Sequence, residues 1–138
     1  MTFIGAGSVE FTRNVVTDLC SFAELRGDLH LALHDVSPER LRHAETLARR
    51  IVAQTGSSAT VTASLDRREA LQGARYVINE IQVGGYDATR LDFDIPARYG
   101  VRQTIADTLG IGGIFRGLRS PFSRASPTSK FSMPIRRS

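Results

Sequence analysis

The chain has 138 residues, enough to bury the core of one domain, and a net charge of +4. It contains no apolar run of 18 residues and starts directly with a strand-like pattern, so we expect neither a membrane span nor a secretion signal. A single cysteine, Cys20, excludes an internal disulfide, and we therefore expect a cytoplasmic location.

The positive charge is concentrated at one end of the chain. Residues 120–138 contain four basic residues and no acidic residue, so residues 1–119 are neutral overall. The segment is rich in Ser and Pro and has no periodicity. We predict a disordered tail without function and no nucleic-acid partner, because charge alone gives only non-specific affinity.

The first residues predict a strand over 1–5 followed directly by a glycine turn, Gly5–Ser8, and a helix. Gly5 would permit the tight turn, and Gly7 would let the backbone approach a pyrophosphate. The free N–H groups at the helix start would then hold the anion. The third glycine of the usual fingerprint is replaced by Glu10, which bears on helix–strand packing.

The following helix is predicted to be amphipathic, with one apolar face that includes Cys20 as a core thiol. That face is formed by Phe11, Val15, Val16, Leu19 and Cys20.

A second strand is predicted over 28–35, where leucines alternate with other residues. Asp35 stands at its end, where a carboxylate can bond the adenosine ribose; the alternative is that it only caps the next helix. Its negative charge would favour NAD over NADP. His30 and His34 share one strand face, but without a third ligand nearby we favour packed or solvated imidazoles over a metal site.

The strand–helix alternation continues to residue 81. Ser37-Pro38 begins a helix that ends at Gly56, and a third strand is predicted over 59–64. Asp66 and Glu69 have capping-box spacing at the start of a short helix, and the fourth strand is predicted over 75–81. This order predicts an α/β fold, a Rossmann-type doubly wound parallel sheet.

Beyond the fourth strand come two glycine-containing segments. Gln82, Gly84 and Gly85 stand past a strand's carboxyl end, where such sheets bind ligands, although an ordinary turn explains them equally well. A helix is then predicted from residue 86 until Pro96, followed by a glycine-rich loop that contains Asp107.

Three motifs together resemble glycoside hydrolase family 4. They are the segments 3–8 (FIGAGS), 83–86 (VGGY) and 103–119 (QTIADTLGIGGIFRGLR), and the third is most similar to the α-galactosidase (melibiase) and α-glucosidase branch. The resemblance covers residues 1–119 and implies that they form the NAD-binding Rossmann part of an α-glycosidase.

The resemblance implies redox-assisted elimination and addition at the O-glycosidic bond, with NAD and a divalent metal, commonly manganese. It implies a small-molecule glycoside substrate and, for the full-length protein, a homo-oligomer. The residues it implies at the cofactor are Gly5, Ala6, Gly7, Ser8, Asp35, Gln82, Gly84 and Gly85, and those at the substrate are Asp107 and Thr108.

After Arg119 the family pattern stops and residues 120–138 match nothing in it. We therefore expect a truncated or frame-shifted chain with an incomplete sheet, no catalytic or metal-binding residue of its own, and no activity alone. Two alternatives remain, namely the NAD-binding half of a 2-hydroxy-acid dehydrogenase and a non-catalytic nucleotide-binding remnant.

Overall fold

The computed structural model describes residues 1–25, 28–81, 84–104 and 110–114. The chain forms two compact units, Met1–Ile81 and Gln82–Ser138. The predicted tail, residues 120–138, lies outside the described residues.

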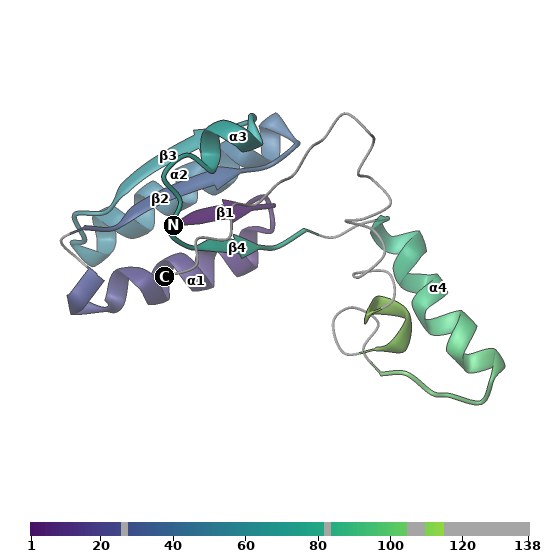
Figure 1. Ribbon diagram of the computed structural model, residues 1–138. Coiled ribbons are helices and arrows are strands. Elements are labelled where there is room, and N and C mark those ends of the chain that lie inside the picture. Colours follow the sequence, from purple (N-terminus) through teal and green to yellow (C-terminus); the bar gives the residue numbers. More distant parts are fainter. Residues whose placement is uncertain (26–27, 82–83, 105–109, 115–138) are drawn as a thin grey trace, which may run out of the picture. The chain divides into compact units, whose positions relative to one another are not determined.

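The first unit is built on a parallel sheet (Figure 1). Its strands are β1 (Thr2–Ile4), β2 (His30–His34), β3 (Thr60–Ser64) and β4 (Val77–Asn79), in the order β3-β2-β1-β4. Every strand falls within its predicted range, and all pairings are parallel. The predicted α/β Rossmann-type sheet is thus confirmed.

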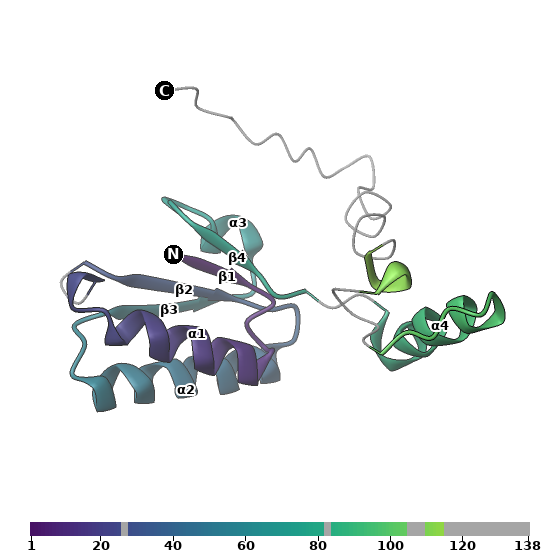
Figure 2. The ribbon, with the colours of Figure 1, turned by 90° about the horizontal axis from the view of Figure 1, so that it is seen from below.

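Helices cover both faces of this sheet. Figure 2 shows α1 (Val9–Ser21) and α2 (Pro38–Thr55) side by side on one face and α3 (Arg67–Ala70) on the other. A short 3-10 turn, η1 (Ala23–Leu25), follows α1. On the α3 side, the Thr2 hydroxyl donates to the carbonyl oxygen of Ala70 (2.8 Å). The sheet is therefore doubly wound, as predicted.

The core lies between the sheet and the α1–α2 layer. Its fully buried members include Phe3, Val16, Cys20, Leu31 and Leu33. Cys20 is fully buried, which confirms the prediction of a core thiol. Burying each of the large aliphatic side chains stabilises the fold by about 1.5–3 kcal/mol.

The predicted apolar face of α1 was wrong at its first position. Phe11 is 67% exposed, whereas Thr12 is fully buried together with Val16 and Cys20. Thr12 occupies the buried position because its hydroxyl donates to the carbonyl oxygen of Ala6 (2.7 Å). The buried stripe therefore begins with a polar side chain that binds the glycine turn.

The ends of α2 agree with the sequence. Ser37 is its N-cap and accepts a hydrogen bond from the Arg40 N–H (3.4 Å), and Pro38 is the first helical residue. Gly56 ends the helix in the left-handed conformation, with φ of 66°.

The capping box of α3 forms only in part. The Asp66 carboxylate accepts a hydrogen bond from the Arg68 N–H (2.7 Å), as an N-cap does. The Glu69 carboxylate instead accepts from the Ser64 hydroxyl (2.5 Å), and the Asp66 N–H donates to the same hydroxyl (3.0 Å). In a complete capping box the Glu69 carboxylate would accept directly from the Asp66 N–H. Here the Ser64 hydroxyl lies between these two groups and bonds both.

The second unit contains α4 (Gly85–Arg98). The helix does not end at Pro96 as predicted but includes this residue and continues for two more. Pro96 lies in the last turn and is buried, and the N–H groups of Tyr99 and Val101 both bond its carbonyl oxygen (3.0 Å each). A proline near a helix end removes one hydrogen bond, and those capping bonds keep the final turn closed.

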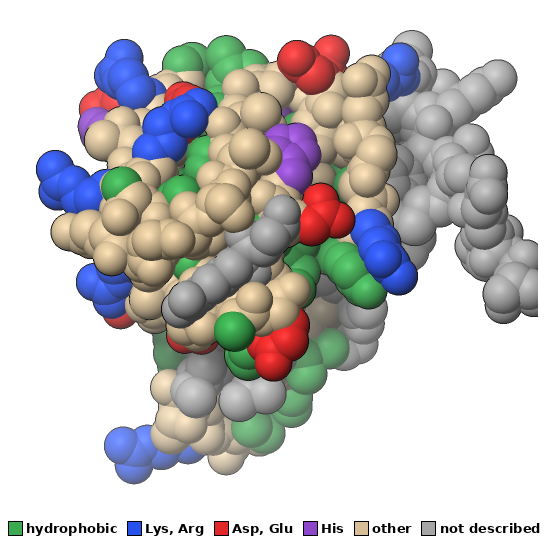
Figure 3. All heavy atoms as spheres, turned by 90° about the vertical axis from the view of Figure 1, so that its left-hand side faces the viewer, with side chains coloured by type: hydrophobic (Ala, Val, Ile, Leu, Met, Phe, Trp, Pro, Cys, Tyr) green, Lys and Arg blue, Asp and Glu red, His purple; other side chains and the backbone are tan. Residues whose placement is uncertain are grey.

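Seen from the side at which the strands begin, the molecule carries both basic and acidic side chains (Figure 3). On this face of the described residues they are interspersed and do not form a surface of a single sign. Among the described residues, no helix is long and apolar enough to cross a membrane.

Candidate nucleotide-binding site

The segment Gly5–Ser8 forms a tight turn between β1 and α1, anchored on the end of β2. The N–H groups of Gly5 and Ala6 both donate to the carbonyl oxygen of His34 (2.9 and 3.0 Å). The Ser8 N–H closes the turn by donating to the Gly5 oxygen (3.0 Å). Backbone hydrogen bonds to His34 therefore fix the first half of the turn against β2.

Gly5 is required by conformation and by space. Its φ of 91° is one that L side chains rarely adopt, and a Cβ there would lie 2.9 Å from the backbone carbonyl carbon of Glu80. The Glu80 N–H in turn donates to the Ile4 oxygen (2.8 Å). The turn thus rests directly on the backbone at the end of β4.

Gly7 is required for a reason that the sequence did not indicate. A Cβ at Gly7 would lie 2.5 Å from Asp35 Oδ2 and 2.7 Å from Arg40 Cβ. The packing of Asp35 and Arg40 against the turn therefore already requires glycine at position 7. The close approach of a pyrophosphate, which the sequence suggested, is not needed to explain this residue.

Asp35 is buried and joins both strand–helix turns. Its Oδ2 accepts from the Gly7 N–H and its Oδ1 accepts from the Ser37 N–H (2.9 Å each). The capping alternative is therefore present in the structure. Each carboxylate oxygen can accept a second hydrogen bond, so the expected ribose contact stays a prediction.

Arg40 was missed by the sequence interpretation. Its guanidinium donates to the Gly7 carbonyl oxygen through Nε (3.3 Å) and Nη2 (3.0 Å). An arginine one turn into a helix looks like any surface charge in the sequence, since nothing marks the carbonyl that it binds. In the fold it adds a positive charge to the glycine turn.

The N-terminus of α1 is open. The first amide to find an acceptor is that of Thr12, which donates to the Ser8 oxygen (2.9 Å). Within the described residues the N–H groups of Val9, Glu10 and Phe11 have no backbone acceptor, and Ser8 forms no side-chain cap. Unpaired amides at a helix N-terminus suit an anionic group.

Beneath the turn lies a second feature that the sequence did not reveal. Glu80 Oε2 is 3.0 Å from the Thr12 hydroxyl oxygen, and Glu80 Oε1 is buried with no partner among the described residues. Burial raises the pKa of the Glu80 carboxyl, and the hydrogen bond with Thr12 lowers the pKa in part.

The remaining candidate residues belong to the second unit. Gly84 is the N-cap of α4, and both Gly84 and Gly85 have positive φ (87° and 60°), which explains the glycine pair as a helix start. Gln82, Asp107 and Thr108 lie outside the described residues. The predicted cofactor and substrate contacts of these five residues stay predictions.

Metal-ligating residues do not cluster in the part of the chain that is described: no group of three or more His, Cys, Asp or Glu could hold a metal ion there. His30 Nε2 lies 2.9 Å from the Thr62 hydroxyl oxygen, and His34 Nδ1 lies 3.0 Å from the Ser64 carbonyl oxygen. The imidazoles thus bond their neighbour strand.

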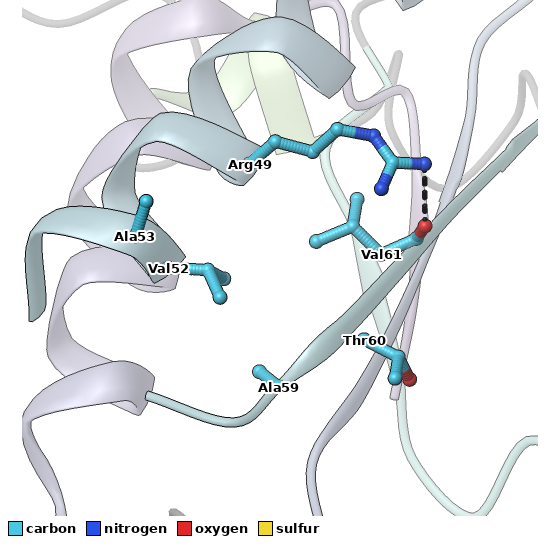
Figure 4. Close-up of a pocket in the computed structure, with 6 residues that line it drawn as sticks. All are labelled: Arg49, Val52, Ala53, Ala59, Thr60 and Val61. Carbon is cyan, nitrogen blue, oxygen red and sulfur yellow. Dashed lines mark hydrogen bonds between the residues drawn. The ribbon is translucent and has the colours of Figure 1, made fainter. Parts of the chain in front are cut away.

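A hollow of about 460 Å³ lies between α2 and β3 (Figure 4). In it the Arg49 guanidinium reaches over Val61 and donates to the Val61 carbonyl oxygen (2.8 Å). It is lined by Arg49, Val52, Ala53, Ala59, Thr60 and Val61. Because these residues lie where β3 begins, the hollow is at the opposite end of the sheet from the glycine turn and is not the candidate site.

A parallel sheet with a glycine turn between its first strand and an open helix N-terminus defines a Rossmann-type dinucleotide-binding fold. The chain belongs to the family 4 glycosyl hydrolases, whose family model matches residues 1–121. It is 50% identical over 121 residues to an α-galactosidase of Bacillus subtilis (strain 168), covering 87% of this chain and 28% of that protein. It is 44% identical over 120 residues to an α-galactosidase of Rhizobium meliloti (strain 1021), covering 87% and 24%.

A solved structure supports the same assignment. The 6-phospho-β-glucosidase of Thermotoga maritima, determined with NAD and glucose-6-phosphate, is 26% identical, with a TM-score of 0.70 over 90% of this chain and 29% of that chain. This chain thus spans about a quarter of the length of its relatives. The family resemblance is confirmed, and the dehydrogenase alternative is set aside.

Proposed function

We propose that residues 1–119 are the NAD-binding region of an α-galactosidase-like family 4 glycosidase. The observation that carries the proposal is the open N-terminus of α1 behind the anchored turn Gly5–Ser8. Its unpaired amides fit a pyrophosphate, and a family relative was solved with NAD.

In this proposal different residues of the site bind different parts of the cofactor. Gly5, Ala6, Gly7 and Ser8 hold the pyrophosphate, and Asp35 bonds the adenosine ribose and disfavours a 2′-phosphate. Gln82, Gly84 and Gly85 line the cofactor and sugar, and Asp107 and Thr108 approach the substrate. Arg40 binds the Gly7 carbonyl oxygen and adds a positive charge beside the open amides at the start of α1.

For the whole enzyme we propose redox-assisted elimination at an α-galactoside in carbohydrate metabolism. Bound NAD supplies reversible hydride acceptance at the sugar C3, which acidifies the C2 proton and permits loss of the aglycone. Among the described residues, no cluster of His, Cys, Asp or Glu is suited to hold manganese. For the 138-residue chain alone we propose NAD binding without glycoside hydrolysis. We also propose a cytoplasmic location.

Calorimetry of the 138-residue chain with NAD and NADP tests the cofactor proposal. We expect saturable NAD binding and weaker NADP binding. Replacing Ser8 by Asp places a carboxylate at the open helix end, which should abolish NAD binding by charge repulsion while the helix stays stable. Equal binding by Ser8→Asp and the parent would contradict the pyrophosphate assignment.

The enzymatic proposal is tested with a chimera. Residues 1–119 replace the matching segment of the Bacillus subtilis α-galactosidase, and the product is assayed with p-nitrophenyl α-galactoside. We expect turnover only with NAD and manganese, and deuterium at C2 of the product formed in D2O. Turnover without NAD, or a product without deuterium at C2, would refute the elimination mechanism.

A further inference from the structure

We propose that Glu80 couples dinucleotide binding to the uptake of one proton, so that the glycine turn binds NAD more tightly when this carboxyl is neutral. This rests on the proposed function, since it concerns the same turn. Three groups carry it: the Ala6 carbonyl, the Thr12 hydroxyl and the Glu80 carboxyl.

The hydrogens in this chain of groups can be counted. The Thr12 hydroxyl oxygen lies 2.7 Å from the Ala6 oxygen and 3.0 Å from Glu80 Oε2, but a hydroxyl has one hydrogen. If the Glu80 carboxylate is ionised, the single Thr12 hydrogen can serve only one of the two contacts. The other contact then brings two oxygen atoms together with no hydrogen between them. With a neutral carboxyl, Glu80 donates to Thr12 and Thr12 donates to Ala6, so each contact contains a hydrogen.

Burial acts in the same direction. Thr12 is fully buried, and Glu80 Oε1 has no partner among the described residues. A buried oxygen without a partner costs more free energy when it is charged than when it is neutral. Burial accordingly raises the pKa of Glu80 and outweighs the lowering that a hydrogen bond donated by Thr12 causes.

The charged side chains on the elements that pack near Glu80 interact with groups other than the Glu80 carboxyl. On α1, Glu10 and Arg13 lie 4.0 Å apart with exposed side chains. Asp35 accepts from Gly7 and Ser37, and Arg40 donates to Gly7. β1 meets Glu80 through backbone atoms. In the described part of the chain, Glu80 forms no ion pair that would hold it ionised.

The coupling between NAD binding and proton uptake follows from the placement of Glu80 beneath the turn that would hold the pyrophosphate. A pyrophosphate on the turn and a carboxylate beneath it are like charges, so the bound anion favours the neutral carboxyl. By linkage, a protein that takes up a proton on binding loses affinity as pH rises. Below the pKa of Glu80 the free protein already carries the proton and affinity is flat. Above it, affinity falls toward about tenfold per pH unit.

Calorimetry with NAD from pH 5 to 8.5, in buffers of different ionisation enthalpy, measures both affinity and proton uptake. We expect the parent to take up a proton and to weaken as pH rises. Glu80→Gln, whose amide donates to Thr12 at every pH, should show a flat profile, no uptake through this group, and tighter binding than the parent at pH 8. Glu24→Gln, the same change on the exposed turn η1, should keep the parent profile.

The outcomes separate the two proposals. NAD binding with the same pH profile in the parent and Glu80→Gln overturns the coupling and leaves the proposed function intact. No NAD binding by either protein at any pH overturns both. Urea unfolding tests the proton chain without NAD: because the folded-state pKa is raised, the parent should lose stability relative to Glu80→Gln as pH rises from 5 to 8. A stability difference that is constant with pH overturns the chain.

Discussion

Two strand–helix junctions in the first unit have the same topology and opposite chemistry. At β2–α2, Ser37 caps the helix, Pro38 removes one amide, and the Asp35 carboxylate accepts from the Ser37 N–H. At β1–α1, Ser8 forms no cap and the first helical amides stay open. The β2–α2 junction caps its helix with its own side chain, whereas the β1–α1 junction, in the part of the chain that the structure describes, leaves three backbone donors for a ligand. The candidate site is therefore visible here as a helix end without a cap.

The largest effect should come from Gly5, which holds the open junction in shape. Gly5→Ala forces an L residue to φ of 91° and places its Cβ 2.9 Å from the Glu80 backbone. We expect a loss of about 3 kcal/mol or more in the free energy of unfolding, measured by urea denaturation. Gly56→Ala is the matched control, because its φ is 66° but nothing lies within 4 Å, and it should cost about 1 kcal/mol.

Asp35→Asn breaks both junctions together. The Gly7 and Ser37 N–H groups donate to different carboxylate oxygens, and asparagine has an NH₂ group in place of one of them, so one of the two donors loses its acceptor. We expect a loss of about 2 kcal/mol in the free energy of unfolding and weaker NAD binding. Unchanged stability would show that Asp35 does not tie the junctions together.

The smallest effects come from one substitution made at each junction. Ser37→Ala removes a cap and should cost about 1 kcal/mol of stability with little change in NAD affinity. Ser8→Ala removes no cap, so stability should hold while NAD affinity falls about tenfold through a lost hydrogen bond to the charged ligand. Equal losses of stability in Ser37→Ala and Ser8→Ala would contradict the statement that only Ser37 caps its helix.

The sequence predicted the capped β2–α2 junction better than the open β1–α1 junction. Ser37, Pro38 and Gly56 act locally, and local spacing was enough to find their roles. Arg40 binds the Gly7 oxygen 33 residues before it, and the Glu80 side chain contacts Thr12, 68 residues before it, so no local spacing marks either residue. Thr12 acts on Ala6, only six residues away, but its role depends on the path of the turn between them. Phe11 was misplaced because a face drawn from apolar residues alone ignores a hydroxyl with a buried acceptor.

The position of β1 between β2 and β4 has a consequence for synthesis on the ribosome. Gly5 leaves the ribosome early, but the backbone on which it rests belongs to Glu80, about 75 residues later. At 5–20 residues per second this is a delay of roughly 4–15 s. The pairing of β2 with β3 through α2 needs a much shorter stretch of chain. The glycine turn therefore gains its support from the β4 side only after Glu80 has been made, although β1 can pair with β2 earlier.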